Sequence, residues 1–214
     1  MYQTIPTKEE YIKALIERHG KENQERFSNA TVAIFGLGGL GSNIAICLAR
    51  AGIGKLILID FDKVDVTNLH RQQYKAYQIG QYKTDALEEN ILEINPYIRI
   101  CKHTDMVTEE NVVGFISEGD IVCEAFDNAI NKAMLVNAVL ENAPDKYIVS
   151  SSGMAGFDSA NSIQTRKISR RFYLSGDGES DVNEGIGLIS SRVMVCAAHE
   201  AHMVLRILMG RETP

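Results

Sequence analysis

The stretch TVAIFGLGGLGS, residues 31–42, decides the fold of this chain. Its first five residues, Thr31–Phe35, are β-branched or apolar and predict a strand that ends abruptly in a run of glycines. A helix is predicted next at Ile44–Arg50, and the run KLILID at Lys55–Asp60 predicts a second strand. A strand, a glycine turn, a helix and a strand form a βαβ unit, whose two strands run parallel and are joined by a right-handed crossover.

The chain around this unit alternates helix and strand as far as residue 150. Before the unit, Thr7 and Glu10 have the T-x-x-E spacing of a capping box and predict a helix that ends near Arg18. After it, apolar residues at helical spacing predict helices at Thr84–Ile94, Glu109–Ser117, Ala129–Glu141 and Ile189–Met209. Short apolar runs predict strands at Ile98–Lys102, Asp120–Ala125, Lys146–Ser150, Ser162–Ile168 and Arg171–Leu174.

This order of elements predicts an α/β fold: a Rossmann-like, doubly wound, mainly parallel sheet with a C-terminal β excursion and a long C-terminal helix. We expect a single domain, because 214 residues bury one substantial core and would be crowded as two. Its expected segments are an N-terminal helical arm (1–30), a nucleotide-binding core (31–150), a β excursion with a crossover loop (151–187) and the last helix (188–214). The crossover loop is expected to be mobile and carries an acidic stretch, formed by Asp177, Glu179, Asp181 and Glu184.

Composition and charge argue against several classes of protein. The chain has 45% hydrophobic and 23% charged residues, as ordinary globular proteins do, and its net charge of -6 argues against a broad nucleic-acid surface. Residues 1–10 lack the apolar segment of a secretion signal, and charged residues interrupt the last helix, so we expect neither export nor a membrane span. The four cysteines stand alone in the sequence, which indicates a reducing cytoplasm.

The glycine run has the pattern of a nucleotide site. Gly36, Gly38, Gly39 and Gly41 allow the main chain to turn sharply and approach a phosphate, and the free N–H groups of the helix start point at it. Asp60, at the end of the second strand, is placed to accept hydrogen bonds from ribose hydroxyls. NAD, FAD, S-adenosylmethionine and ATP all use this kind of site, so the glycines alone leave the nucleotide open. A purely structural turn is the alternative.

The segment after Asp60 favours a triphosphate. It supplies Arg71 and Lys83, and a triphosphate that is being split needs cations on its leaving phosphates, whereas a dinucleotide can rest on the glycine turn. Asp127 follows the strand predicted at Asp120–Ala125 and would project into the same crevice, where a carboxylate and phosphate oxygens can hold Mg²⁺. Alternatively, Asp127 is the N-cap of the next helix, and either base belongs to a solvated ion pair.

Several motifs in this order resemble the ThiF/MoeB/HesA family, the bacterial relatives of ubiquitin-activating enzymes. They are GLGGLGS at 36–42, DFDKVDVTNLHRQ at 60–72, GQYK at 80–83, INP at 94–96 and EAFDN at 124–128. The ending has GMAG at 153–156, SIQTRKI at 162–168 and GIGLISSRVMVCAAHEAHMVLRILMG from residue 185. This ending resembles the short ThiF subgroup, whose members adenylate the sulfur carrier ThiS in thiamine thiazole synthesis. The resemblance spans nearly the whole chain.

The resemblance implies that ATP and Mg²⁺ are used to adenylate the C-terminal glycine carboxylate of a small, ThiS-like carrier ending in Gly-Gly, with release of pyrophosphate. The resemblance implies that the ribose is bound by Asp60, Mg²⁺ by Asp127, and the phosphate chain by Asn68, Arg71 and Lys83. The phosphates would also be lined by Gly36, Gly38, Gly39 and Gly41, and Asp62 and Gln72 would lie in the surrounding shell. The family also implies a homodimer, in which the partner's N-terminal helix supplies an arginine. Arg18 is the nearest candidate for it.

The chain departs from longer relatives in its cysteines. Those relatives carry two CxxC pairs that bind structural zinc, and this sequence has none, so no zinc site is expected. Many relatives also hold an acceptor cysteine in the crossover loop, whereas residues 151–187 contain no cysteine. Cys47, Cys123 and Cys196 are expected to pack inside the protein. We therefore expect adenylation without a thioester on this chain.

Three other interpretations remain open at this point. A tRNA threonylcarbamoyladenosine dehydratase would activate a small carboxylate on tRNA, against which the net charge of -6 argues. An NAD-dependent oxidoreductase would leave the charged residues after Asp60 without a role. A catalytically silent binding module would not need them either.

Two further groups of side chains have no clear assignment from sequence. The basic cluster of Arg166, Lys167, Arg170 and Arg171 fits a carrier contact, a tRNA contact or a solvated face equally well. His199 and His202 lie three residues apart in the last predicted helix and could share a metal, but no further ligand is near in sequence. We expect them to be packed or hydrogen-bonded.

Overall fold

The computed structural model describes residues 5–182 and 185–214, so Glu184 of the acidic stretch lies outside the described residues. The helices are α1 (Lys8–His19), α2 (Lys21–Asn29), α3 (Gly39–Arg50), α4 (Lys83–Leu92), α5 (Val112–Glu118), α6 (Ala129–Asn142) and α7 (Ser190–Leu208). The strands are β1 (Thr31–Phe35), β2 (Lys55–Ile59), β3 (Arg99–His103), β4 (Ile121–Glu124), β5 (Tyr147–Ser151), β6 (Gln164–Lys167) and β7 (Phe172–Gly176). Short 3-10 helices lie at η1 (Val66–Asn68), η2 (Ala76–Gln78) and η3 (Ala160–Ser162).

The strands form one sheet in the order β3-β2-β1-β4-β5-β7-β6, which confirms the doubly wound α/β prediction. All neighbouring pairs are parallel except β6 and β7, which form the antiparallel hairpin expected in the C-terminal excursion. The chain moves outward in one direction from β1 to β3 and in the other direction from β4. The carboxyl ends of β1 and β4 therefore flank the switch point at which such sheets bind ligands.

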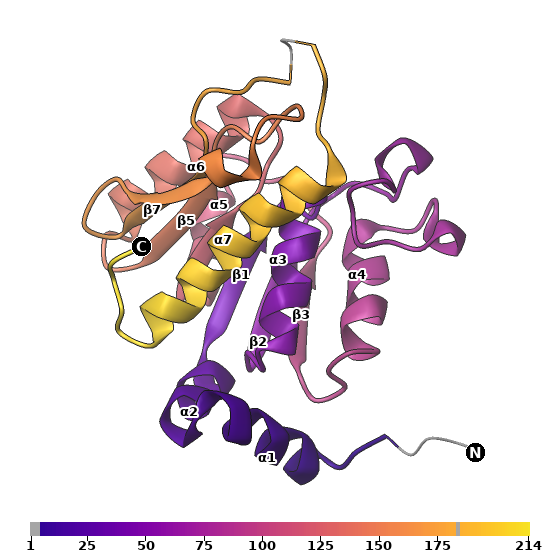
Figure 1. Cartoon of the computed structure of the whole chain (residues 1–214), viewed down its shortest axis with the longest axis vertical. Helices are drawn as coiled ribbons and strands as arrows, with labels where there is room; N and C mark the ends of the chain where they lie inside the picture. The colour runs from indigo at the N-terminus through magenta and orange to yellow at the C-terminus, as the bar shows by residue number, and fades with distance from the viewer. Residues whose placement is uncertain (1–4, 183–184) are drawn as a thin grey trace.

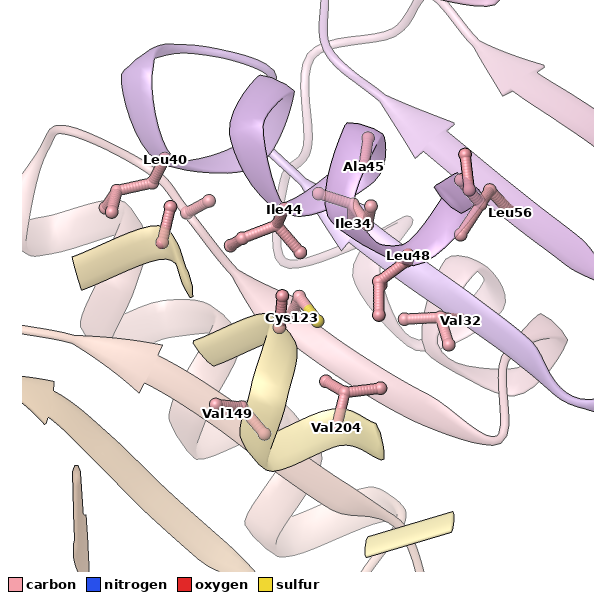
Figure 2. Packing of buried hydrophobic residues seen from close by; sticks show 14 of the residues in the cluster. Val32, Ile34, Leu40, Ile44, Ala45, Leu48, Leu56, Cys123, Val149 and Val204 are labelled. Carbon is pink, nitrogen blue, oxygen red and sulfur yellow. The ribbon is translucent and has the colours of Figure 1, made fainter. Parts of the chain in front are cut away.

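Helices cover both faces of the sheet, as Figure 1 shows, with α3, α4 and α7 on one face and α5 and α6 on the other. Alternate residues of β1 divide between the two faces: Val32 and Ile34 pack toward α3 and α7, while Ala33 and Phe35 pack toward α5 and α6. Figure 2 shows the first of these cores, where Cys123 of β4 lies among aliphatic side chains of the sheet and the two helices. The near-continuous apolar strands are those of a sheet buried on both faces.

The N-terminal helices lie beyond the amino ends of the strands, at the bottom of Figure 1. Thr7 and Glu10 form the predicted capping box. The second helix, α2, was not predicted, because Phe27 is the only large apolar residue in its sequence KENQERFSN. Gln24 of α2 donates to the main-chain oxygen of Gly52, just after α3, at 3.2 Å, which fixes the arm to the end of α3 farthest from the glycine turn.

The last helix, α7, is buried along one side and packs across α3. Arg192 in its first turns forms a buried ion pair with Asp177, whose carboxylate also accepts from the backbone N–H groups of Glu179 and Ser180. The start of the acidic stretch, expected to be mobile, is thus held by α7. Across the described residues, no helix combines the length and hydropathy needed to cross a membrane.

Candidate functional site

The glycine turn connects β1 to α3 at the switch point. Gly36 has a φ of 87°, and a Cβ there would lie 2.7 Å from the main-chain oxygen of Ala125. A Cβ on Gly41 would lie 1.8 Å from the main-chain oxygen of Gly36, so neither position tolerates a side chain. The helix begins at Gly39, earlier than predicted, and Gly38 before it provides no side-chain cap. The first N–H groups of α3 are therefore free to meet an anion.

Asp60 and Lys83 lie behind this turn. The carboxylate of Asp60, 7% exposed, accepts hydrogen bonds from the backbone N–H of Leu37 at 2.6 Å and of Asp62 at 2.7 Å. Lys83, in the first turn of α4, lies 2.7 Å from the Asp62 carboxylate and 3.6 Å from that of Asp60. Burial raises the pKa of Asp60, and the ammonium of Lys83 opposes the rise. Lys83 is therefore within the site but already paired with two carboxylates.

Arg71 and Gln72 have buried polar atoms without a partner. Among the described residues, Nε of Arg71 and Oε1 of Gln72 make no hydrogen bond although both atoms are inaccessible to solvent. A Cβ on Gly39 would lie 3.3 Å from Cγ of Arg71, and one on Gly38 3.8 Å from Nε2 of Gln72, so both side chains lie against the turn. Burial lowers the pKa of Arg71, and the nearby Asp127 carboxylate opposes this shift. The unpaired N–H of Arg71 beside a glycine turn fits an anionic group, and the amide oxygen of Gln72 fits a hydrogen-bond donor of the same ligand.

Asp127 and Asn68 both lie near Arg71. Asp127 is exposed at the end of β4, but it is not the helix cap that its position also suggested. That cap is Asn128, whose side-chain oxygen accepts from the backbone N–H groups of Ile130 and Asn131. Asn68 ends η1, and its main-chain oxygen accepts from the N–H of Arg71 at 3.2 Å. The carboxylate of Asp127 is thus free of a capping role and available to a cation.

A set of hydrogen bonds that sequence analysis did not anticipate joins residues 71–74 to the glycine turn. Asn43 donates from its side chain to the main-chain oxygen of Arg71, and its own oxygen accepts from Gln73 at 2.6 Å. The Ser42 hydroxyl accepts from the N–H of Gln73, and the Tyr74 hydroxyl donates to the main-chain oxygen of Leu37 at 2.7 Å. These partners lie 28 to 37 residues apart in sequence. Together they hold the Arg71 segment over the turn.

Arg18 is far from this crevice within its own chain. It is exposed on α1, and α1 and α2 lie at the amino ends of the strands, whereas the glycine turn lies at their carboxyl ends. The ring of Tyr11 in α1 packs 6.0 Å from that of Tyr97, which precedes β3. Arg18 therefore does not contribute to the glycine turn of its own chain.

A second polar region, which sequence analysis missed, is buried beneath α7. Glu124 at the end of β4 and Glu200 in α7 are both 0% exposed. Lys132 of α6 approaches Glu124 at 3.0 Å, and Ser150 donates to the same carboxylate at 2.5 Å. Glu124 also accepts from the N–H of Phe126, next to Asp127. Burial raises the pKa of Glu200 to about 8, with Glu124 adding to the rise and Lys132 opposing it.

The cysteines divide between core and surface. Cys123 and Cys196 are buried, as expected, and burial raises the pKa of both thiols, with Glu200 adding to each shift. Cys47 was expected to pack but is exposed on α3. The expectation of packing was wrong for this cysteine, although partial burial still raises the pKa of its thiol. A buried thiol with a raised pKa carries little thiolate at neutral pH and is a poor nucleophile.

The other two groups of uncertain residues have internal partners. His199 bonds to the hydroxyl of Thr165 at 3.1 Å, as expected of a hydrogen-bonded histidine, while His202 is exposed. In the basic cluster, Arg166 donates to main-chain oxygens after β7, Lys167 pairs with Glu212 and Arg171 stacks on Tyr147. Much of this positive charge is therefore engaged within the protein.

A triphosphate with its cation fits the donor set of this crevice. Free N–H groups at the start of α3 and the unpaired guanidinium nitrogen of Arg71 are anion ligands, and the exposed Asp127 carboxylate is a ligand that Mg²⁺ accepts. The glycine positions leave the turn without side chains that would block a phosphate. The arrangement can bind and polarise a phosphate chain, with Asp60 at the place where a ribose is held in such folds.

Comparisons with known proteins relate the chain to one family and to several relatives. Residues 12–214 match the family profile described as ThiF family. The chain is 37% identical over 153 residues to the tRNA threonylcarbamoyladenosine dehydratase of Bacillus subtilis, covering 71% of this chain and 59% of that protein. It is 36% identical over 128 residues to the probable adenylyltransferase/sulfurtransferase MoeZ of Mycobacterium tuberculosis, covering 58% of this chain and 32% of that protein.

A solved structure matches the whole chain. The crystal structure of the Escherichia coli tRNA N6-threonylcarbamoyladenosine dehydratase in complex with ATP superposes with a TM-score of 0.86 at 25% identity. The match covers 97% of this chain and 98% of that one. In sequence, however, the chain spans less than two thirds of the length of these two curated relatives.

Proposed function

The chain belongs to the ThiF family, and from this premise we propose that it is an enzyme that uses ATP to adenylate a carboxylate. The observation that carries the proposal is the pair of unpaired polar atoms, Arg71 Nε and Gln72 Oε1, beside a glycine turn that tolerates no side chain. A Rossmann site for NAD would leave these atoms and the charged Asp127 without a ligand.

The proposed reaction is an attack of a carboxylate oxygen on the α-phosphate of ATP. A bond forms between that oxygen and the α-phosphorus, the bond from the α-phosphorus to the bridging oxygen breaks, and pyrophosphate leaves. Arg71 and Lys83 neutralise the charge that develops on the leaving phosphates, and Asn68 binds the same phosphate groups. Asp60 orients the ribose, and Asp127 would hold Mg²⁺, which supplies further neutralisation when bound.

Lys83 must exchange partners for this role. Its ammonium lies 2.7 Å from the Asp62 carboxylate, so a phosphate oxygen has to compete with Asp62 for it. Both oxygens of Asp60 accept from backbone N–H groups, and each retains a second lone pair for a ribose hydroxyl. Gln72 completes the shell with its unpaired oxygen, which can accept a hydrogen bond.

For the substrate we propose the C-terminal glycine carboxylate of a small, ThiS-like sulfur carrier ending in Gly-Gly, activated in the cytoplasm for thiazole synthesis. The net charge of -6 and the internal engagement of the basic cluster support a protein substrate over a polyanionic one. The similarity to MoeZ, an adenylyltransferase/sulfurtransferase by its name, supports the same class. Residues 151–187 contain no cysteine, so the acyl group stays on AMP until another protein takes it.

The proposed enzyme is a homodimer in which Arg18 of one copy serves the site of the other. The support is geometric: Arg18 is exposed on an arm that lies at the opposite end of the sheet from its own glycine turn. An exchange of arms across a two-fold axis would bring it to the partner's crevice.

A tRNA-borne carboxylate is the second candidate substrate. It is favoured by the similarity to the Bacillus subtilis dehydratase over 71% of this chain and by the end-to-end match with the Escherichia coli structure. A tRNA would have to be held by positive charge that this acidic chain offers only locally.

Carrier-dependent exchange of labelled pyrophosphate into ATP tests the proposal. We expect exchange with a ThiS-like carrier, no exchange when its terminal glycine is removed, and a loss of about a hundredfold or more in Arg71→Ala. Arg99→Ala is the matched control, because Arg99 is exposed at the amino end of β3. ATP binding without exchange for any carrier would overturn the carrier assignment. A steep salt dependence of tRNA binding would then support the second candidate.

A further inference from the structure

A cluster of three different metal-ligating side chains lies at the sheet edge opposite β6. Cys101 and His103 are on β3 and Glu118 is the last residue of α5. Their ligand atoms all lie within 4.8 Å of one another. Cys101 and His103 are two residues apart on a strand, so both side chains point to the face that α5 covers.

The distances within this triad match a shared ion. Sγ of Cys101 lies 3.7 Å from Nε2 of His103 and 3.9 Å from Oε2 of Glu118, and Nε2 of His103 lies 2.9 Å from Oε1 of Glu118. Ligands at roughly 2.0 to 2.3 Å from a tetrahedral zinc ion are separated by about 3 to 4 Å. These distances use both carboxylate oxygens of Glu118, and one ligand atom from each residue lies within 4.8 Å of the other two, so a small movement of the side chains would bring three ligands to the corners of such a tetrahedron.

The three side chains converge on one point and do not form a proton relay. In a catalytic triad, the acid and the nucleophile contact opposite nitrogens of the histidine ring. Here both Glu118 and Cys101 face the same nitrogen, Nε2. A proton could not pass from the thiol through the ring to the carboxylate, whereas a cation between the three atoms would contact all of them.

Neighbouring charges leave the triad available. Lys146 lies at the end of α5, and its ammonium donates to the main-chain oxygens of Ile116, Ser117 and Gly119. Glu118 is left with His103 as its ion-pair partner among the described residues. The ring of His103 packs against Phe115 at 4.7 Å, which fixes its orientation.

We propose that Cys101, His103 and Glu118 bind one thiophilic divalent cation, Zn²⁺ or a similar ion, with the fourth position left to water. Thiolate, imidazole and carboxylate together suit zinc better than Mg²⁺ or Ca²⁺, which require oxygen ligands. The expectation of no zinc rested on missing CxxC pairs, and this ligand set differs from them. The ion ties the edge strand β3 to the end of α5.

The triad is separate from the nucleotide site but adjacent to one of its supports. The main-chain oxygen of His103 accepts a hydrogen bond from the N–H of Asp60 at 3.2 Å. A cation bound to the side chain of His103 would hold the strand end that positions Asp60. The inference itself depends on the triad alone and stands whether or not the chain adenylates a carboxylate.

The test uses the full chain without a polyhistidine tag, stripped with a chelator and kept reduced. Titration with Co²⁺ is expected to produce the intense near-ultraviolet band of a cobalt thiolate, saturating at one ion per chain and disappearing when Zn²⁺ is added. Competition with a chromogenic chelator then gives the zinc affinity. We expect Cys101→Ser to abolish the band and to weaken zinc binding about a hundredfold or more, since loss of even an outer-shell partner costs ten- to a hundredfold.

Two further variants test the third ligand and control for the loss of a cysteine. Glu118→Gln changes a partly exposed side chain and is expected to weaken zinc about tenfold or more while the cobalt thiolate band remains. Cys47→Ser is the matched control, because Cys47 is an exposed cysteine on α3. Its zinc affinity and band should equal those of the wild type. Absence of the band in the wild type, or equal zinc affinity of the wild type and both triad variants, would overturn the proposal.

Discussion

Two regions of this molecule contain the same charges: one lysine and two carboxylates. In the turn site, Lys83 lies between Asp60 and Asp62, and in the acid cluster beneath α7, Lys132 is shared by Glu124 and Glu200. Their surroundings differ. Both oxygens of Asp60 accept from backbone N–H groups, whereas Glu200 has no backbone donor among the described residues and only the Ser151 hydroxyl beside it.

The donors and cations around a buried carboxylate decide whether it keeps or loses its charge. Backbone donors and Lys83 oppose the effect of burial on Asp60, and the site stays able to exchange partners with a ligand. Burial raises the pKa of Glu200 to about 8 and the charge of Glu124 adds to the rise, while Lys132 and the Ser151 hydroxyl oppose it without offsetting it. The turn site is therefore suited to binding, while the acid cluster is a structural element that carries a proton.

Replacing each lysine with methionine should give the largest effects, and the two regions should respond differently. We expect Lys83→Met to reduce the rate of pyrophosphate exchange about a hundredfold or more, because a cation on the leaving phosphates is lost. Its thermal unfolding should change less, since Asp60 keeps two backbone donors. A variant with normal exchange would remove Lys83 from the proposed machinery. Lys102→Met, whose lysine pairs with Asp85 and Glu88 at the surface, should exchange at the wild-type rate.

Lys132→Met should have the opposite profile. The change leaves Glu124 buried and without its cation, and we expect the free energy of unfolding in urea to fall by about 3 kcal/mol. Lys102→Met serves again as the control, with a loss of less than about 1 kcal/mol because its partners are partly exposed. Equal losses in the two variants would mean that burial does not distinguish the two ion pairs.

A smaller effect is expected from Glu200→Gln, and it depends on pH. With a native pKa of about 8 against an ordinary value of 4.5, native Glu200 holds a proton that the unfolded chain releases. The free energy of unfolding of the wild type should therefore fall as pH rises from about 5 to about 8. The glutamine variant should not show this fall, because its side chain does not titrate. Between pH 6 and pH 8.5 the variant should gain about 2 kcal/mol relative to the wild type.

Urea unfolding at both pH values measures this difference. Glu22→Gln is the control, because Glu22 is an exposed residue of α2 paired with Arg26, and its curve should remain parallel to that of the wild type. A Glu200→Gln curve that also runs parallel would show that Glu200 is charged in the native state throughout this range.

The sequence predicted those parts of the fold that depend on local pattern. The strand at 31–35, the glycine turn, the capping box at Thr7 and the C-terminal hairpin all follow from residues close together in the chain. Helix α2 was missed because its sequence has almost no apolar periodicity. The cap before α6 was assigned to Asp127 as one alternative, and the structure gives it to Asn128, because the two residues offer the same chemistry one position apart.

The site was predicted as a set of residues but not as an arrangement. The sequence pattern assigned Arg71 and Asp60 to the site with the glycines, and the family resemblance added Gln72. The structure places all three beside the glycine turn. The pairing of Lys83 with Asp62 could not be foreseen, because it depends on how α4 meets the end of β2. The acid cluster was missed for the same reason: Glu124 and Glu200 are 76 residues apart, and neither belongs to a local motif.

The hydrogen bonds from Ser42, Asn43 and Tyr74 that hold residues 71–74 have a consequence for binding entropy. A free loop carrying a charged side chain loses conformational freedom when a ligand arrives, and this loss weakens the affinity. Here the backbone of the loop is already ordered by the folded core. The entropic cost of ordering it belongs to folding, so an arriving ligand has only side chains left to immobilise.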